Sequence, residues 1–508
     1  MRRPVLLALM SGALLWLSFP KFGHPAVAWV ALAPLLLAVE AAGGRAAFRL
    51  GFLTGVTSSL GLLYWTALVV EQYGGLGPLA ANLAMLLLCL AFAVGHGVFA
   101  ALVAAGLRGF GRGALLAAPL AWVAVELVRV RSYFQFPWCL LGYSQHSELP
   151  WLQLASLGGV YAVSALVALP SAVIAWSAGE QRPFRRRAAL AALAGTLVGI
   201  FAWGSWRLAQ PLAASGSLRV ALVQPSIAQD EKWRSGLMAE HLLHHLRLSR
   251  ERASGARLVV WPESAVPWLL EESPGVLDRL RGLAKDGDQY LLFGNDDREG
   301  AGPDARIFVG AKLLTPGGEL ALSHHKLRLV PFGEYVPLAP LFTLGGRFAA
   351  RVVGAVGTFT PGEELRLGVA DGVPLAALVC YEAIFPELTR EFVGAGAGLL
   401  VNVTNDAWYG RSSAPWQHFA MARVRAVETG RSLVRAANTG ISAVVDPRGR
   451  MLAATGLFEE QVLVHDAPIA AGLTLYVRTG DAFAWGCLAA TAGLAGLALL
   501  REGRRRRA

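Results

Sequence analysis

Three residues far apart in the sequence have the types and settings that acyl-transfer chemistry requires. Cys380 ends the apolar run of PLAALVCYEAIFPE, Glu263 lies in VVWPESAVP, and Lys326 lies in HHKLRLVPFGEYVP. Glu263 and Cys380 follow apolar runs typical of buried β-strands, and Lys326 follows a similar run, so strand ends would carry all three to the edge of a sheet. A thiol accepts acyl groups well only as a thiolate, and its ordinary pKa of about 8.5 leaves little thiolate at neutral pH. A carboxylate that takes the proton and an ammonium that stabilises negative charge would activate it.

A cysteine that follows a strand is, by itself, more often a small buried apolar residue. Here the order Glu, Lys, Cys and the segments around each residue point to catalysis instead. These segments resemble the nitrilase (carbon–nitrogen hydrolase) superfamily, and the resemblance covers roughly residues 217–470. The resemblance implies that Glu263 is the general base, Lys326 the oxyanion-stabilising cation and Cys380 the nucleophile.

The same region mixes strand-like and helix-like segments, and the resemblance implies the α-β-β-α sandwich of the superfamily. LRVALVQPS, ARLVVWPE, QYLLFGND and GAGLLVNVTND are apolar runs that predict strands, and a hairpin is predicted around Pro316-Gly317-Gly318. Helices are predicted over 241–252 and 418–431, and LAALVCYEAIFPE predicts a strand, a sharp turn at the cysteine and a helix start.

The rest of the chain has the composition of a membrane protein. The sequence of 508 residues is 55% hydrophobic, with a mean hydropathy of +0.47, and a membrane-spanning helix needs about 20 apolar residues. The sequence therefore predicts an α-helical membrane domain of about eight spans joined to the α/β sandwich domain. The predicted spans lie near 5–19, 25–42, 47–70, 79–106, 113–128, 151–177, 188–208 and 481–500. The first resembles a signal peptide, but it has no clear cleavage site and is interpreted as an anchor.

Basic residues predict the orientation of these spans. With the N-terminus in the cytoplasm, the inner segments hold fifteen arginines, whereas the short outer loops hold Lys21, Arg129 and Arg131. The boundaries predicted are a membrane domain of seven spans over 1–209, an extracytoplasmic catalytic domain over 210–476, and a last span with an Arg-rich cytoplasmic tail over 477–508. The catalytic domain is therefore expected on the side of the membrane away from the cytoplasm.

The distribution of charge argues against nucleic acid as a partner. The net charge is +11, but residues 210–476 hold 26 Lys and Arg against 28 Asp and Glu, and the remainder holds 20 against 7. The basic excess thus belongs to the membrane domain, where it marks the cytoplasmic face. Of the four cysteines, only Cys380 falls in 210–476, which suits a free thiol. No metal motif is present, and no cofactor is expected.

The chain as a whole resembles the apolipoprotein N-acyltransferase family of bacteria, through FPWCLLGYSQ, WPESAVP, KLRLVPFGEYVP, VCYEAIFPE and NDAWYG. The resemblance implies a phospholipid as acyl donor, a thioester on Cys380, and a diacylglyceryl-cysteine lipoprotein whose α-amine accepts the acyl chain. The apolar, Gly-rich segment 338–357 would then be a lid or arm that touches lipid, with Phe342 in its most hydrophobic patch.

Other residues are candidates for supporting or substrate-binding roles. The resemblance implies Glu334 as an additional glutamate beside Lys326 and Trp233 as a substrate-side tryptophan. Tyr381 can offer a backbone N–H to an oxyanion, and Glu382 is either a supporting carboxylate or a favourable charge at a helix start. Tyr335, Asn405 and Trp408 are candidates for lining the site, with ordinary packing as the alternative.

Two other classes of function compete with acyl transfer to a lipoprotein. A membrane-anchored nitrilase-type amidase that hydrolyses a small amide would use the same three residues, but it needs neither eight spans nor a lipid-facing arm. A non-enzymatic membrane scaffold would not need the catalytic residues.

Overall fold

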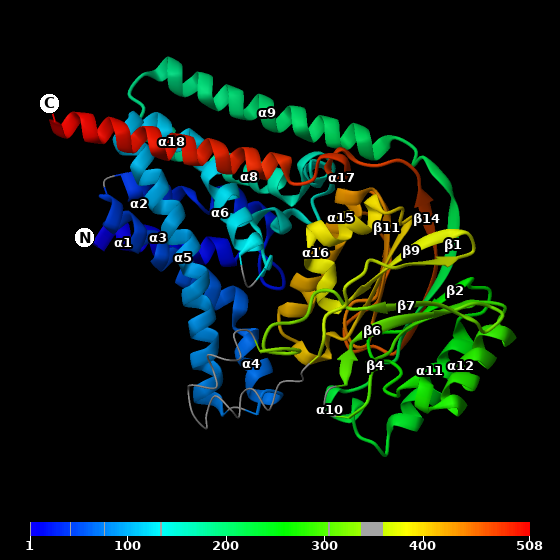
Figure 1. Ribbon diagram of the computed structural model, residues 1–508. Helices are drawn as coiled ribbons and strands as arrows, with labels where there is room; N and C mark the ends of the chain where they lie inside the picture. Colours follow the sequence, from blue (N-terminus) through cyan, green and yellow to red (C-terminus); the bar gives the residue numbers. More distant parts are fainter. Residues whose placement is uncertain are drawn as a thin grey trace. The chain divides into compact units, whose positions relative to one another are not determined.

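The structure is a computed structural model that describes residues 2–40, 42–75, 77–132, 135–302, 305–336 and 359–507 (Figure 1). The chain divides into two compact units, which are considered separately. The first, here called the helical unit, comprises Met1–Gln72, Leu76–Gln210 and Thr479–Ala508, and the second, the sandwich unit, comprises Tyr73–Gly75 and Pro211–Arg478.

The described part of the helical unit contains five apolar stretches long enough to cross a membrane. Two predicted spans, near 79–106 and 113–128, fall within one of these stretches, Pro78–Arg131. The five stretches are α3 (Gly44–Leu63), the run of α5 (Pro78–Phe110), η2 (Gly111–Ala117) and α6 (Ala118–Arg131), α8 (Ala155–Ser177), α9 (Pro183–Ala209) and α18 (Ala482–Arg507).

The predicted spans near 5–19 and 25–42 form shorter helices. Proline explains the division of the second, because it lacks a backbone N–H and is tolerated in the first turn of a helix. Pro25 begins η1 and Pro34 lies in the first turn of α2. The full number of eight spans therefore stays a prediction. The shorter helices are α1 (Arg2–Trp16), η1 (Pro25–Val30), α2 (Ala33–Glu40), α4 (Trp65–Gln72), η3 (Leu141–Gln145) and α7 (Leu149–Leu152).

Close packing holds the helical unit together. A Cβ atom added to Gly51 of α3 would lie 2.3 Å from the carbonyl oxygen of His96 on α5, so only glycine permits this approach. Arg108 near the end of α5 forms an ion pair with Glu502 of α18, with a distance of 3.3 Å between Nε and Oε2.

The sandwich unit contains two mixed six-stranded sheets and a two-stranded ribbon. The first sheet has the order β14-β1-β2-β3-β6-β7 and the second β13-β12-β11-β10-β9-β8. The first comprises β1 (Ala214–Gln224), β2 (Leu258–Val260), β3 (Tyr290–Gly294), β6 (Gly310–Leu314), β7 (Leu320–His325) and β14 (Gln461–Ala470). The second comprises β8 (Leu367–Ala370), β9 (Val373–Val379), β10 (Leu399–Thr404), β11 (Ser432–Ala437), β12 (Ala443–Val445) and β13 (Met451–Ala454), and the ribbon β4 (Asp297–Glu299) and β5 (Arg306–Phe308).

Apolar side chains from the inner faces of both sheets form one core. Alternate residues of β9, namely Leu375, Ala377 and Val379, pack with residues of the first sheet such as Val220 and Val260. The other face of the first sheet packs against α11 and α12, and α15 and α16 lie beside the second sheet (Figure 1). The helices and turns of the unit are α10 (Gln229–Lys232), α11 (Met238–Arg252), η4 (Leu270–Glu272), α12 (Pro274–Asp286), η6 (Cys380–Ile384), α15 (Pro386–Gly394), η7 (Asp406–Tyr409), α16 (Ala414–Thr429) and α17 (Leu475–Thr479).

The predicted strands and helices of this region are confirmed in type, with small differences in their ends. The predicted hairpin forms between β6 and β7, and residues 305–309, expected to begin it, instead contain β5 of the ribbon. The predicted strand, turn and helix start around Cys380 are β9, η6 and α15.

Candidate active site

Strand directions bring the three predicted catalytic residues to one edge of the sandwich. Glu263 follows β2, which runs parallel to β3. Strand β6 is antiparallel to β3, and β7 is antiparallel to β6, so β7 runs in the same direction as β2. Lys326, which follows β7, therefore lies at the same edge of the sheet as Glu263. Cys380 directly follows β9 of the facing sheet. Electrostatic interactions connect Cys380 with both Glu263 and Lys326.

Lys326 lies between two carboxylates. Its Nζ atom is 2.6 Å from Glu334 Oε1 and 3.3 Å from Glu263 Oε1. The lysine is fully buried and Glu263 is only 7% exposed. The second oxygen of each carboxylate accepts a hydrogen bond from a backbone N–H. Glu263 Oε2 accepts from Asn405 (3.0 Å), and Glu334 Oε2 accepts from Val330 (2.8 Å). Both acids are thus held in place while they face the ammonium.

These contacts fix the protonation state of the lysine. Burial alone lowers the pKa of an amine, but the carboxylates of Glu334 and Glu263 outweigh it and hold the pKa of Lys326 well above its ordinary value. Lys326 therefore acts as a permanent cation and cannot serve as a base at neutral pH. Burial raises the pKa of Glu334, although the bond to Lys326 opposes this shift.

Cys380 occupies a strained turn. Its φ angle is +52°, in the left-handed region that favours glycine, and Ser264, next to Glu263, has a φ of +47°. The cysteine is 5% exposed. Burial, with a further contribution from Glu263, raises the pKa of the Cys380 thiol above its ordinary value despite the opposing effects of Lys326 and a hydrogen bond with Thr404. The thiol is therefore protonated at neutral pH, and it would need a base to act as a nucleophile.

Glu382 connects the segments that carry Cys380 and Lys326. Its Oε2 accepts from the backbone N–H of Val379 (2.7 Å) and its Oε1 from that of Leu327 (2.6 Å). Val379 precedes Cys380 and Leu327 follows Lys326. Because the fully buried carboxylate of Glu382 bonds both of these residues, it sets the spacing of the two segments. Of the two interpretations from the sequence, these contacts favour the supporting carboxylate.

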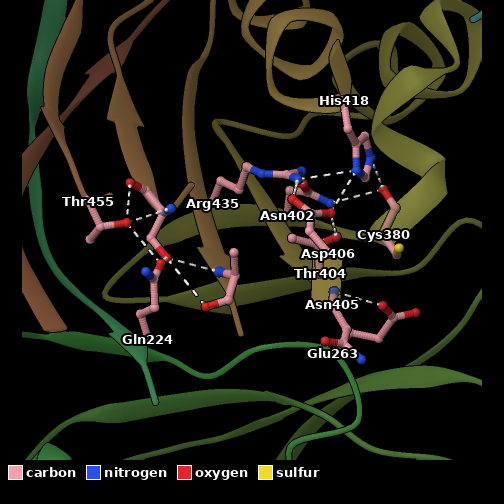
Figure 2. Close-up of polar contacts among 12 residues, drawn as sticks. Gln224, Glu263, Cys380, Asn402, Thr404, Asn405, Asp406, His418, Arg435 and Thr455 are labelled. Carbon is pink, nitrogen blue, oxygen red and sulfur yellow. Dashed lines mark hydrogen bonds and ion pairs between the residues drawn. The ribbon is translucent and has the colours of Figure 1, made fainter. Parts of the chain in front are cut away.

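A second charged cluster lies behind Cys380 (Figure 2). The carbonyl oxygen of Cys380 accepts from His418 Nε2 at 3.2 Å and from Asn402 Nδ2 at 3.3 Å. Asp406 bonds His418 through Oδ1 (2.9 Å) and Arg435 through Oδ2 (2.7 Å). In Figure 2 the carbonyl of Cys380 faces His418, while its sulfur lies on the side of Glu263. The cluster therefore fixes the turn and leaves the thiol on the side of Glu263.

The remaining predicted residues differ in how deeply they are buried and in which residues of this site they contact. Asn405 is buried, and its backbone bonds Glu263 while its side chain bonds Gln229 (2.7 Å) and Asn438 (3.0 Å). Tyr381 is buried beside Phe385, and it interacts electrostatically with Tyr335. Trp233 and Trp408 are 46% and 36% exposed, so neither is a core residue. Phe342 and segment 338–357 lie outside the described residues.

The sequence analysis missed five ionisable residues beside the three predicted ones. Asp406 stands in the motif NDAWYG, but no local signal connects it with His418 on α16 or Arg435 on β11. Lys232 donates from Nζ to the backbone oxygen of Glu263 at 2.7 Å, and Asp296 interacts electrostatically with Glu263. Both come from polar sequences, QDEKW and NDDRE, that look like exposed turns. In the ranges described above, no group of three His, Cys, Asp or Glu residues is arranged to hold a metal ion.

Comparison with known proteins identifies the family. Residues 219–471 match the carbon-nitrogen hydrolase family, and residues 11–173 match the apolipoprotein N-acyltransferase N-terminal domain. The apolipoprotein N-acyltransferase of Geobacter metallireducens is 41% identical over 99% of this chain and 96% of its own length. The chain belongs to the apolipoprotein N-acyltransferase family.

Two further similarities are found, one to a relative and one to a solved structure. The apolipoprotein N-acyltransferase of Vibrio vulnificus is 32% identical over 95% of this chain and 94% of its own length. Among solved structures, an amidase from Nesterenkonia sp. is 26% identical over 54% of this chain and 97% of its own, with a TM-score of 0.37. Membership of the apolipoprotein N-acyltransferase family accounts for both parts of the chain, the apolar helices and the α/β unit.

Proposed function

We propose that this protein transfers an acyl chain from a phospholipid to the α-amine of a diacylglyceryl-cysteine lipoprotein through a thioester on Cys380. The observation that carries the proposal is the convergence of Glu263, Lys326 and Cys380 at one edge of the sandwich, in a chain of the apolipoprotein N-acyltransferase family. A buried thiol beside a carboxylate and a fixed cation suits acyl transfer.

In the first half-reaction, Glu263 takes the proton of the Cys380 thiol while sulfur attacks the ester carbonyl of the phospholipid. Lys326 stabilises the oxyanion of the tetrahedral intermediate, assisted by the backbone N–H of Tyr381. The intermediate collapses, the C–O bond breaks, and Glu263 returns its proton to the departing lysophospholipid oxygen. In the second half-reaction, the amine attacks the thioester, the C–S bond breaks and the thiol is regained.

The proposed setting is a bacterial inner membrane. The apolar helices of the helical unit hold the protein in the membrane, and the bias of fifteen basic residues against three supports a catalytic domain on the periplasmic side. The boundaries 1–209, 210–476 and 477–508 belong to this proposal, as does the seven-span membrane domain. Alkaline phosphatase fused after Ser215 should be active in cells, and a fusion after Arg507 should be inactive; the reverse pattern would contradict the topology.

The experiment that tests the function is acyl transfer in detergent. The purified protein should move a labelled acyl chain from a phospholipid to a synthetic diacylated lipopeptide, whereas Cys380→Ser should not. Release of the label as free fatty acid, with none on the lipopeptide, would mean that water is the acceptor and would contradict the proposal. Release of ammonia from small amides without acyl transfer would favour the membrane-anchored amidase instead.

A further inference from the structure

Two charged residues next to Glu263, one buried and one partly buried, have no part in the mechanism above. Lys232, at the end of α10, is 5% exposed and donates to the backbone oxygen of Glu263. Asp296 follows β3 and is partly buried, with its Oδ1 atom fully enclosed. A buried charge is costly unless it is paired, so both residues need an explanation.

Backbone packing places Asp296 at the edge that carries Glu263. Strands β2 and β3 are parallel neighbours, and a bridge continues their pairing from Val266 to Asn295. A Cβ atom added to Gly294 would lie 2.5 Å from Glu263 Cα, so the chain of β3 directly touches the segment of the proposed base. Asn295 then bonds the carbonyl oxygens of Val266 and Trp268, at 2.8 and 2.7 Å, which fixes the residue just before Asp296.

The charges around this edge do not balance. Asp296 interacts electrostatically with Glu263, Lys232, Glu334 and Lys326. These are three carboxylates and two ammoniums, so one carboxylate lacks a cation. The geometry indicates which one: Glu263 and Glu334 both bond Lys326, whereas no donor among the described residues lies within hydrogen-bond distance of Asp296 Oδ1. The site is therefore prepared for one additional positive charge.

The second half-reaction supplies such a charge and also a surplus proton. The α-amine of a peptide has a pKa of about 7.7–8.0, so the acceptor arrives mainly as an ammonium at neutral pH. An ammonium must lose two protons to become an amide nitrogen with one hydrogen. One proton returns through Glu263 to the sulfur of Cys380, and the other needs a second acceptor.

We propose that Asp296 binds the α-ammonium of the incoming acceptor and takes its surplus proton before the amine attacks the thioester. The inference rests on the proposed function and assigns the amine subsite of the same site. After transfer, protonated Asp296 gives this proton to solvent, and Glu263 gives the other to the Cys380 thiolate, so both protons are accounted for.

The titration of the group agrees with this role. Burial and the nearby Glu263 raise the pKa of Asp296 to about 7, against the opposing influence of Lys232. A carboxylate with this pKa can take a proton from an ammonium and release it again near neutral pH. Burial lowers the pKa of Lys232 to about 8, so this lysine is still mainly charged at pH 7 and cannot replace Asp296 as acceptor there.

The test separates the two half-reactions in the full-length protein. Cys380 is first acylated with phospholipid alone, and the loss of the adduct is then followed by intact mass after adding an acceptor. The diacylated lipopeptide is a cationic acceptor, whereas hydroxylamine is uncharged at neutral pH. Asp296→Asn, which preserves size, is compared with Asp297→Asn, because the neighbouring Asp297 instead contacts His325 (3.1 Å) and Lys312 (3.3 Å).

We expect Asp296→Asn to acylate normally and to react normally with hydroxylamine, but to lose the acyl group to the lipopeptide on the order of 10²-fold more slowly at pH 7. This deficit should shrink as pH rises and the free amine appears. Asp297→Asn should behave like wild type. A wild-type rate with the lipopeptide, an equal loss with hydroxylamine, or the same loss in Asp297→Asn would overturn the proposal. Absence of any adduct on the wild type would contradict the proposed function itself, and this inference with it.

Discussion

The two buried charged clusters on either side of Cys380 are built from similar residues but differ in how completely they are paired. Behind the cysteine, both oxygens of Asp406 are bonded, to His418 and Arg435. On the side of the sulfur, no donor in the described part of the chain bonds Asp296 Oδ1. Asp296 interacts there with the carboxylates of Glu263 and Glu334 and with the ammoniums of Lys326 and Lys232. We call the first the closed cluster and the second the open cluster.

This difference distinguishes a cluster that supports the turn at Cys380 from a cluster suited to proton transfer. Asp406 is paired with the fully buried guanidinium of Arg435, and breaking such a pair would leave a buried charge without its partner, so this carboxylate resists displacement. Burial alone would raise the pKa of Asp406, yet Arg435 and His418 hold it well below its ordinary value, whereas Asp296 has a raised pKa. This contrast favours the open cluster as the place of the proposed proton transfer, whereas the closed cluster bonds the carbonyl oxygen of Cys380 and holds the turn.

The largest effect on catalysis is expected in the open cluster. Glu263→Gln removes the proposed general base and should reduce the rate of acyl transfer by about 10²–10⁴-fold. The variant should remain folded, because Gln keeps the size of the side chain and an oxygen for the backbone N–H of Asn405. Steady-state transfer together with thermal unfolding checks both statements; near-normal turnover would show that Glu263 is not the base.

The closed cluster should show the opposite pattern. Asp406→Asn leaves the buried Arg435 without its carboxylate, and breaking a buried ion pair costs about 3–5 kcal/mol of stability. Thermal and denaturant unfolding in detergent measure the loss. Asp466→Asn is the matched control, because its ion pair with Arg219 is exposed and its loss should change stability little. Equal stability of the two variants would contradict the supporting role of the closed cluster.

Glu382, which joins the segments that carry Cys380 and Lys326, should give an intermediate effect. Glu382→Gln replaces one carboxylate oxygen by an amide NH₂, so the backbone N–H of Val379 or of Leu327 loses its acceptor. The unpaired N–H should lower the free energy of unfolding by about 1–3 kcal/mol. Because the carboxylate sets the spacing of Cys380 and Lys326, we expect kcat to fall by about 10–10²-fold with KM nearly unchanged. A rise in KM at constant kcat would instead indicate a role in substrate binding.

The smallest effect on the rate of the first half-reaction is expected at Asp296, and the prediction there concerns the pH dependence of stability. Its pKa is about 7 in the folded protein and has the ordinary value of 3.8 in the unfolded chain. Asp296 thus binds more protons in the folded than in the unfolded state between these values, so its contribution to the free energy of unfolding falls as pH rises from about 4 to 7. Asp296→Asn cannot ionise, and its melting temperature should exceed that of wild type increasingly over this range. A constant difference would show that Asp296 does not titrate in this way.

The sequence predicted the open cluster better than the closed one for a physical reason. Glu263, Lys326 and Cys380 each follow an apolar strand, and the resemblance to a known superfamily joined them. Asp406, His418 and Arg435 meet only because β10 and β11 pair in the register that sets Asn402 opposite Arg435, and tertiary packing decides this register. The burial of Asp296 was hidden for a similar reason, since NDDRE has the composition of an exposed turn.

The helical unit shows the same limit. Composition predicted apolar spans, and five stretches of suitable length are present in the described residues. Composition did not reveal that the segment near 25–42 would divide into η1 and α2, with prolines in their first turns. Hydropathy measures how apolar a segment is, whereas the backbone of individual residues decides where a helix begins.

The central claim is that Cys380 carries the acyl group between two substrates, and the mass of the intact protein tests it most directly. After incubation with phospholipid and no acceptor, the wild type should gain the mass of one acyl chain, and hydroxylamine should remove it. Cys380→Ala should show no gain. A wild type without an adduct, or an adduct that persists in Cys380→Ala, would contradict the account.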